Sequence, residues 1–156
     1  FNYGAEIELE TPVTDQLAFF ASVGLLKTEY KDFVDAGGNL NLDGREQPHA
    51  PGYTFRTGFN MNISDHWSTQ LAIEGKDRFY FSDSNNQQSD PYQLVNFTVA
   101  YHRENWTLSF WARNIFDTDY DTRGYYFGNE PPDFPDKLWT TKGDPAQVGI
   151  TWEYLY

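Results

Sequence analysis

The chain of 156 residues contains no cysteine, only one methionine and no long apolar run. Without cysteine it has no disulfide, no thiol nucleophile and no cysteine-bound metal. Because about 18 consecutive apolar residues are needed to span a bilayer as a helix, a transmembrane helix is excluded. Basic residues are also scarce: 11 Lys and Arg against 23 Asp and Glu give a net charge of −12, which argues against a nucleic-acid partner.

Aromatic residues, in contrast, are abundant. The chain has 13 Phe, 11 Tyr and 5 Trp, or 19% of its residues, although its mean hydropathy is −0.68. Many aromatic side chains in a polar chain are typical of a sheet whose two faces meet different surroundings, one apolar and one aqueous. No linker divides the sequence, so we expect one domain over residues 1–156.

The last nine residues alternate most clearly between large apolar and smaller or polar side chains. One face of a strand there would carry Val148, Ile150, Trp152, Tyr154 and Tyr156. Similar alternation predicts seven strands, at residues 1–10, 16–32, 53–63, 67–81, 92–103, 106–116 and 148–156. An apolar strand that runs to the final residue is typical of an outer-membrane β-barrel, because soluble domains usually fray at their termini.

The predicted connections alternate in length. Those at 11–15, 64–66 and 104–105 are short, whereas those at 34–52, 82–91 and 117–143 are longer. Bacterial barrels have short periplasmic turns and long extracellular loops, so the two patterns together predict an antiparallel transmembrane β-barrel segment. The periplasmic rim would then carry an aromatic girdle, made of Trp67, Trp106, Tyr154 and Tyr156.

Two other classes of protein fit part of the pattern. A soluble β-sandwich, such as a carbohydrate-binding or adhesion module, would also alternate and would bury its aromatic faces between two sheets. A complete small porin-like barrel would share the faces but needs an even number of strands. The sequence contains no serine-hydrolase, zinc-protease or phosphate-loop motif, so no enzyme is expected.

Two segments resemble a known family. Residues 110–120, FWARNIFDTDY, resemble the N-L/I-F-D-x-x-Y signature of TonB-dependent outer-membrane receptors. Residues 143–156, GDPAQVGITWEYLY, resemble their closing strand, with Ala146 where arginine is common and Tyr156 in place of the usual terminal Phe or Trp. Residues 48–55 resemble a strand entry seen in many of these receptors. The likeness covers nearly the whole chain and is strongest over residues 93–156.

The resemblance implies more than the residues alone. Members of the family have a 22-stranded barrel plugged by an N-terminal domain, so seven strands would form the C-terminal part, with the plug and the upstream strands absent from this chain. It implies residence in the outer membrane of a Gram-negative bacterium, in contact with lipid. It further implies uptake of a scarce nutrient, most often a ferric siderophore, energised through the TonB complex without a cofactor. The assembly signal read by the barrel assembly machinery would be Trp152, Tyr154 and Tyr156.

Candidate ligand-binding residues lie in the predicted loops. The loop at 117–143 carries exposed aromatic side chains, and the loop at 34–52 carries a histidine; the candidates are Tyr125, Tyr126, Phe127, Trp139 and His49. Such rings could stack on an aromatic iron chelator or pack on a sugar, or they could fold the loop upon itself over the barrel mouth. His49 could equally be a solvated loop residue.

Charged side chains on the polar faces of the strands would point into the lumen. These are Arg56, Glu74, Lys76 and Arg113, which are expected to contact the plug or to line a path. No metal site is predicted. The segment from Asp117 to Asp121 resembles the start of a calcium loop, but it lacks glycine at the sixth position and glutamate at the twelfth.

Overall fold

The computed structural model describes residues 1–34, 41–83 and 85–156, which form strands joined by turns and loops. No helix in these residues is long and apolar enough to cross a membrane. The strands are β1 (Asn2–Pro12), β2 (Leu17–Thr28), β3 (Tyr53–Ser64), β4 (Trp67–Lys76), β5 (Tyr92–His102), β6 (Trp106–Arg113), β7 (Asp121–Gly128), β8 (Asp136–Lys142) and β9 (Gln147–Tyr154).

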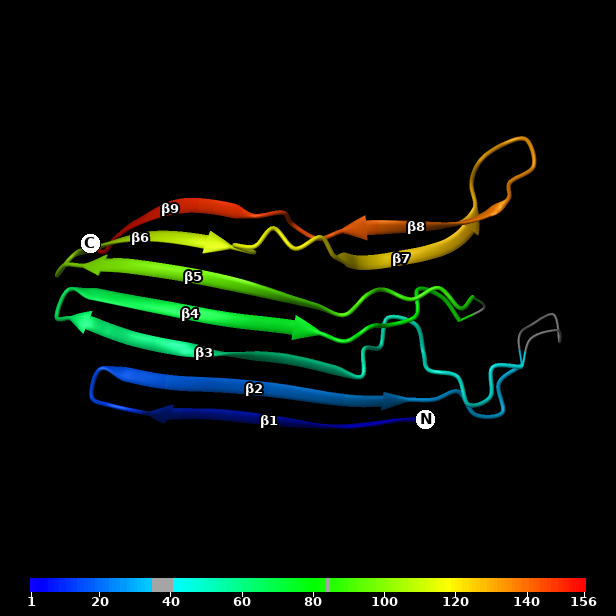
Figure 1. The fold of residues 1–156 in the computed structure, drawn as a ribbon, viewed down its shortest axis with the longest axis horizontal. Coiled ribbons are helices and arrows are strands. Elements are labelled where there is room, and N and C mark those ends of the chain that lie inside the picture. Colours follow the sequence, from blue (N-terminus) through cyan, green and yellow to red (C-terminus); the bar gives the residue numbers. More distant parts are fainter. Residues whose placement is uncertain (35–40, 84) are drawn as a thin grey trace.

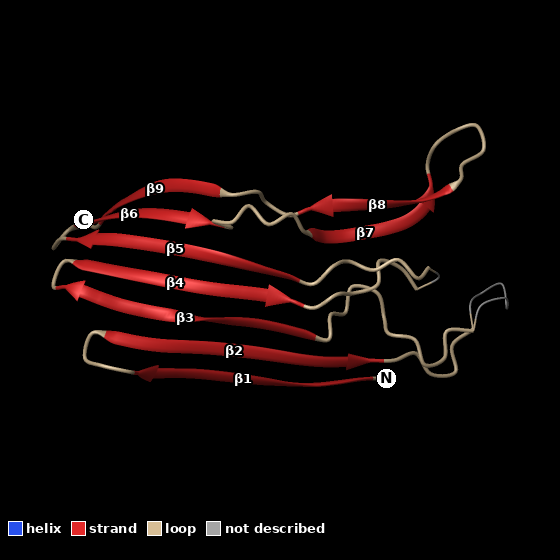
Figure 2. Cartoon of the chain, in the orientation of Figure 1, coloured by secondary structure: helices blue, strands red, loops and turns tan. Residues whose placement is uncertain are grey.

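Seven strands form one antiparallel sheet in the order β1-β2-β3-β4-β5-β6-β9. Figure 1 shows this sheet as a single layer, with the short turns at one end and the long connections at the other. β7 and β8 form a separate hairpin beyond the loop end (Figure 2). The predicted seven-stranded antiparallel sheet is confirmed. Within the described residues no second sheet covers it and β1 does not pair with β9, which argues against both a sandwich and a closed small barrel.

One face of the sheet is apolar and open. The strand register places apolar side chains side by side across the sheet, for example Phe19 with Phe59 and Phe110 with Ile150. Most large side chains of this face are exposed rather than packed: Phe59 and Phe110 are each 43% exposed, and Ile150 is 72% exposed. Exposing an apolar band of this extent to water is unfavourable. The same band is favourable in contact with the hydrocarbon of a bilayer.

The opposite face is polar, and the same register orders it into rows. One row runs from Glu8 on β1 through Ser22 and Arg56 to Glu74 on β4. Because side chains alternate along every strand, a continuous apolar face on one side requires a continuous polar face on the other. The predicted division of side chains between the two faces is therefore confirmed.

The predicted bounds of several strands were too long. β4 ends at Lys76 rather than at residue 81, because Phe79 and Phe81 turn into the loop and become buried there. β2 ends at Thr28 rather than at residue 32. β6 ends at Arg113 rather than at residue 116, because Asn114 adopts a positive φ of 47° that a strand does not allow.

The predicted loop at 117–143 contains a β-hairpin, β7–β8, that the sequence analysis did not predict. Tyr125 on β7 lies opposite Trp139 on β8, and Tyr126 lies opposite Leu138. Aromatic residues that face one another across an antiparallel pair stabilise it. The aromatic residues that suggested a ligand site therefore also build the strands that carry them.

Candidate functional site

The most deeply buried large apolar side chains lie among the connections, not in the sheet. Phe79 is 2% exposed, and Phe81 and Leu42 are each 3% exposed. Gly124 of the hairpin lies against the Phe81 ring so closely that a Cβ atom would overlap it. The connection after β2, the connection after β4 and the β7–β8 hairpin therefore pack into one ordered assembly at the loop end.

Arg45 holds the connection after β2 to the connection after β4. Its guanidinium lies over the Tyr80 ring, with 4.2 Å between Cζ and the ring centre. It donates hydrogen bonds to Asn86 Oδ1 at 2.8 Å, to the Ser82 carbonyl at 3.3 Å and to the Asn85 carbonyl. No sequence pattern indicates this contact, since Arg45 and Asn85 are 40 residues apart.

His49 lies where the three connections meet. Its ring centre is 5.4 Å from that of Phe79 and 5.8 Å from that of Tyr125 on the hairpin. The backbone turns there with a φ of 56°, and the His49 amide donates to the Tyr80 carbonyl at 2.9 Å. Two of the five predicted ligand-binding residues, His49 and Tyr125, are thus brought together.

The surroundings of His49 lower the pKa of its ring below the ordinary value of 6.5. Although part of the ring is open to water, burial is the largest cause, followed by the positive charges of Lys76 and Arg123. The nearby carbonyl groups of Gly124 and Phe81 oppose the shift without cancelling it. A proton on His49 would therefore work against the packing of the loop end.

The stability of the loop end should consequently depend on pH. Since the folded pKa is the lower one, the unfolded chain binds the proton first as the pH falls below 6.5. The free energy of unfolding should then decrease until the pH has passed the folded pKa. An NMR titration of the His49 ring should give a pKa below 6.5, and His49→Gln should flatten the pH dependence. A His49 pKa above 6.5 would contradict the packing described above.

The hairpin presents its aromatic residues on two faces. Tyr125 and Phe127 share one face, and Trp139 adjoins them: its ring centre is 6.3 Å from that of Phe127, and its Nε1 donates to the Phe127 carbonyl at 3.2 Å. Tyr125 is 50% exposed and Phe127 is 46% exposed. Tyr126 lies on the opposite face with Gly124. The structure thus separates Tyr126 from the other predicted aromatic contacts.

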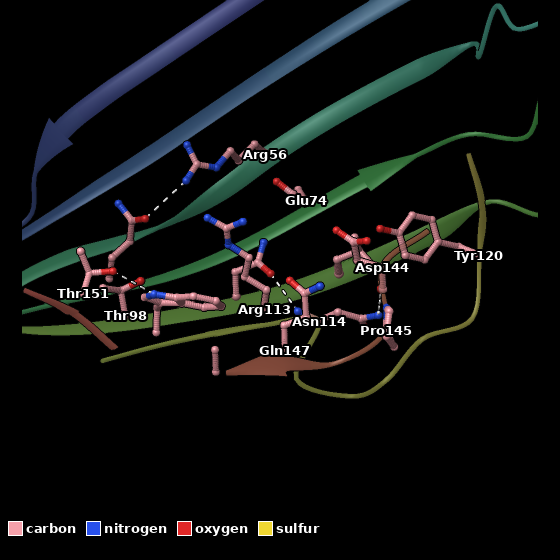
Figure 3. Close-up of a pocket in the computed structure, with 15 residues that line it drawn as sticks. Arg56, Glu74, Thr98, Arg113, Asn114, Tyr120, Asp144, Pro145, Gln147 and Thr151 are labelled. Atoms are coloured by element: carbon pink, nitrogen blue, oxygen red, sulfur yellow. Dashed lines mark hydrogen bonds between the residues drawn. The ribbon is translucent and has the colours of Figure 1, made fainter. Parts of the chain in front are cut away.

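Three of the four predicted lumen residues line one cavity on the polar face of the sheet. Arg56, Glu74 and Arg113 contribute to a cavity of about 510 Å³, drawn in Figure 3. Lys76 does not line this cavity. Its ammonium instead lies 4.3 Å from the centre of the Phe79 ring at the loop end, so it supports the packed connections.

The N-I-F-D-x-x-Y segment ties the end of β6 to the start of β9. Asn114 is 3% exposed, and its amide group donates to the carbonyl groups of Thr118 at 2.9 Å and Asp144 at 3.1 Å. Its Oδ1 accepts from the Thr118 amide at 2.9 Å. Asp117 Oδ1 accepts from the Ala146 amide at 2.8 Å. These contacts fix the two ends of the hairpin insertion on the sheet.

The tyrosine of the same segment completes this junction. Tyr120 lies over Gly143, where a Cβ atom would overlap the tyrosine ring, and its ring centre is 4.3 Å from that of Tyr92 on β5.

The nearby acids do not gather into a metal site. Lys142 lies 3.2 Å from Asp119 and 3.3 Å from Asp121, and no metal-binding group of residues occurs in the described parts of the chain.

Aromatic side chains also gather at the turn end of the sheet. The Tyr101 ring centre lies 4.9 Å from that of Trp67 and 5.6 Å from that of Trp106. At the C-terminal end of the chain, the ring centres of Trp152 and Tyr154 are 6.0 Å apart, and those of Tyr154 and Tyr156 are 5.5 Å apart. The structure therefore places the predicted girdle residues together at one end of the apolar face.

The sheet has one exposed apolar face and one polar face, with short turns at one end and packed loops at the other. This combination is that of the wall of a transmembrane β-barrel. The family model described as "TonB dependent receptor-like, beta-barrel" matches residues 1–115. The chain belongs to this family of TonB-dependent receptor-like β-barrels.

Solved structures of similar fold are receptors several times longer. The ferric yersiniabactin uptake receptor FyuA from Yersinia pestis matches 98% of this chain with a TM-score of 0.77 and 18% identity; the chain covers 23% of that receptor. The siderophore receptor PiuA from Acinetobacter baumannii matches 97% with a TM-score of 0.75 and 16% identity, with 21% of the receptor covered. The ferric-catecholate import receptor Fiu from E. coli K12 matches 97% with a TM-score of 0.70 and 17% identity, with 20% of the receptor covered. The chain spans between a fifth and a quarter of these receptors.

Proposed function

We propose that this chain forms part of the wall and mouth of an outer-membrane transporter of a Gram-negative bacterium that takes up a ferric siderophore. The apolar face contacts lipid, and the polar face lines the lumen. Transport is energised through the TonB complex, and the strand bearing Trp152, Tyr154 and Tyr156 is read by the barrel assembly machinery. The observation that carries the proposal is the exposed apolar face combined with an ordered aromatic surface at the loop end.

The hairpin offers the ligand surface. Tyr125, Phe127 and Trp139 are exposed side by side, and His49 adjoins Tyr125. Planar rings of this kind stack on aromatic chelators or pack against the apolar parts of other ligands. Tyr126 lies on the opposite face of β7, so it is not proposed to be part of this surface. Arg56, Glu74 and Arg113 are proposed to face the plug or the transport path.

The proposal is tested by iron uptake in cells that express the native polypeptide carrying this sequence. Cells are offered radiolabelled iron chelated by catecholate, hydroxamate or carboxylate siderophores. We expect accumulation of at least one chelate, dependent on TonB. Surface binding without accumulation would instead indicate an adhesion module, and recovery of the polypeptide in the soluble fraction would refute the membrane location.

The ligand surface is tested by substitution in the same assay. Trp139→Ala and Tyr125→Ala should each weaken chelate binding roughly tenfold, as the loss of one stacking ring usually does. Phe134→Ala is the control, because Phe134 is 58% exposed near the tip of the hairpin and lies outside the surface. An equal loss in all three variants would show that the hairpin acts through its fold alone.

A further inference from the structure

The Tyr101 ring is the centre of a cluster of aromatic and basic side chains at the turn end of the apolar face. The guanidinium of Arg103 lies over this ring, with 5.2 Å between Cζ and the ring centre, and the His66 ring meets it edge-on at 6.0 Å. Trp67 and Trp106 complete the cluster, with ring centres 4.9 Å and 5.6 Å from that of Tyr101. A positive charge is thus held among the girdle residues.

Arg103 lies at the level where a bilayer changes from hydrocarbon to headgroups. It follows Phe97, the middle residue of β5, by six positions along the chain. Six residues extend about 20 Å along a strand. A strand tilted by about 45° converts this length into about 14 Å along the bilayer normal, close to half of the roughly 30 Å of hydrocarbon. An arginine at this level can reach the phosphate groups of the lipids.

A hollow of about 730 Å³ adjoins the cluster, between the β3–β4 turn and the β5–β6 turn. Its lining carries charges of both signs, the guanidinium of Arg103 and the carboxylates of Asp65 and Glu104. Trp106 and Tyr154 add aromatic surface to the same lining. The hollow therefore suits a ligand that carries an anionic group and a cationic group next to an apolar part.

The turns that frame the hollow are fixed relative to one another. The His102 amide donates to the His66 carbonyl at 2.8 Å, and the Leu155 amide donates to the Asn105 carbonyl at 2.9 Å. The His102 ring also borders the hollow but belongs to the polar face, where its Nε2 lies 2.7 Å from Ser68 Oγ. The hollow is therefore a built feature of the rim.

The position of the hollow does not depend on the rest of a longer receptor. Both neighbouring strands of β3, β4, β5 and β6 are present in this chain, so no further strand lies between the two turns. Only β9, which carries Tyr154, has an edge open to another strand. A plug would contact the polar face, whereas Arg103 and Tyr101 lie on the apolar one.

We propose that this hollow binds the headgroup of a zwitterionic phospholipid whose cation is a primary ammonium, the chemistry of phosphatidylethanolamine. The guanidinium of Arg103 donates to two phosphate oxygens, and the His66 ring offers a further N–H donor beside it. Asp65 and Glu104 accept hydrogen bonds from the ammonium. The acyl chains lie along the apolar face. The site rests on the proposed function in one respect, namely that this face contacts a bilayer.

The charges of the hollow distinguish this lipid from two others. Phosphatidylglycerol offers the same phosphate but no cation, so Asp65 and Glu104 would repel it. Phosphatidylcholine has a cation without any N–H, so it cannot donate a hydrogen bond to these carboxylates. Phosphatidylethanolamine should therefore bind most tightly of the three.

The test is native mass spectrometry of the native polypeptide, extracted in detergent from outer membranes, stripped of lipid and titrated with each of the three phospholipids. Arg103→Gln should weaken the binding of phosphatidylethanolamine roughly tenfold, because the phosphate loses its charged partner. Arg78→Gln is the matched control. Arg78 is an exposed arginine at the loop end, where its guanidinium donates to Gln88 Oε1 at 2.6 Å, so the variant removes the same charge far from the hollow.

The two carboxylates provide a sharper test, because their removal should invert a preference. The double variant Asp65→Asn, Glu104→Gln keeps the phosphate donors but loses both negative charges. It should bind phosphatidylethanolamine less tightly and phosphatidylglycerol more tightly than the native protein does. A merely damaged rim would bind both lipids less tightly, so the inversion separates headgroup recognition from a loss of structure.

Two results would overturn the site: binding to the native protein that does not favour phosphatidylethanolamine, as at a girdle without headgroup recognition, or an Arg103→Gln variant that binds this lipid as tightly as the native protein. Heat-modifiable migration on gels confirms that each variant is folded. The iron-uptake assay reports the proposed function separately. Uptake without the lipid preference would remove the site and keep the function, and the lipid preference without uptake would do the reverse.

Discussion

Phe97→Arg should destabilise the protein in a bilayer by about 2–4 kcal/mol, the cost of an arginine at the midplane of the lipid-facing side of a barrel. Phe97 lies in the middle of β5 and opposite Leu71, which is 43% exposed on the apolar face. The guanidinium would have to remain in hydrocarbon or pull water and headgroups toward it. Unfolding by urea in phospholipid vesicles measures the effect.

The position along the strand and the face provide the controls. Leu108→Arg should cost less than Phe97→Arg, because Leu108 lies opposite Tyr101, near the aromatic residues of the turn end, where an arginine can reach the interface. Ser109→Arg, on the polar face next to Leu108, should be mild. Asn96 also lies on the polar face, but Asn96→Arg is a poor control because Asn96 Oδ1 accepts a hydrogen bond from the Asn114 backbone amide at 3.0 Å. Equal losses for Phe97→Arg and Ser109→Arg would refute the assignment of the faces.

Asn114→Ala should lower the free energy of unfolding by about 3 kcal/mol, the upper range for one buried polar side chain. The substitution removes the hydrogen-bond partner of the Thr118 and Asp144 carbonyl groups and of the Thr118 amide. Asn114 is only 3% exposed, so water cannot readily replace the lost bonds. It also places alanine at a φ of 47°, which asparagine adopts more readily. Urea unfolding again provides the measurement.

The consequence of this substitution should be local as well as global. Since Asn114 joins the end of β6 to the start of β9, the variant should release the hairpin, which limited proteolysis between residues 117 and 146 would detect. Asn62→Ala, at an exposed asparagine of β3, is the control and should change neither quantity. A stable Asn114→Ala protein with a protected hairpin would show that the tyrosine and aspartate of the segment suffice.

The sheet was predictable because it depends on a periodic pattern of apolar and polar side chains along the sequence. Every second side chain of β9 is apolar, and the same alternation in six other segments fixes the faces without knowledge of the partners. An exception was visible as well: Phe20 interrupted the pattern, but its contact with the guanidinium of Arg56 could not be predicted, because the two residues are 36 positions apart in the sequence.

The loop end could not be predicted because its contacts are neither periodic nor local. His49 contacts Phe79 in the connection after β4 and Tyr125 in the hairpin, and Arg45 contacts carbonyl groups of the connection after β4. Lys76 illustrates the limit: the strand pattern assigned it to the lumen, yet its ammonium lies on the Phe79 ring among the packed loops. A side chain at the end of a strand can follow either the sheet or the loop, and alternation does not distinguish the two.

The way the hairpin joins the sheet has a consequence for how such proteins diversify. β6 and β9 pair directly up to Arg113 and Gln147, and the junction of Asn114 with Thr118 and Asp144 closes immediately beyond them. The segment from Asp121 to Lys142 is therefore added beyond a β6–β9 strand pair that is already complete. Insertions, deletions and exchanges in this hairpin can accumulate over evolution without disrupting the sheet, so the proposed ligand surface can change faster than the wall that supports it.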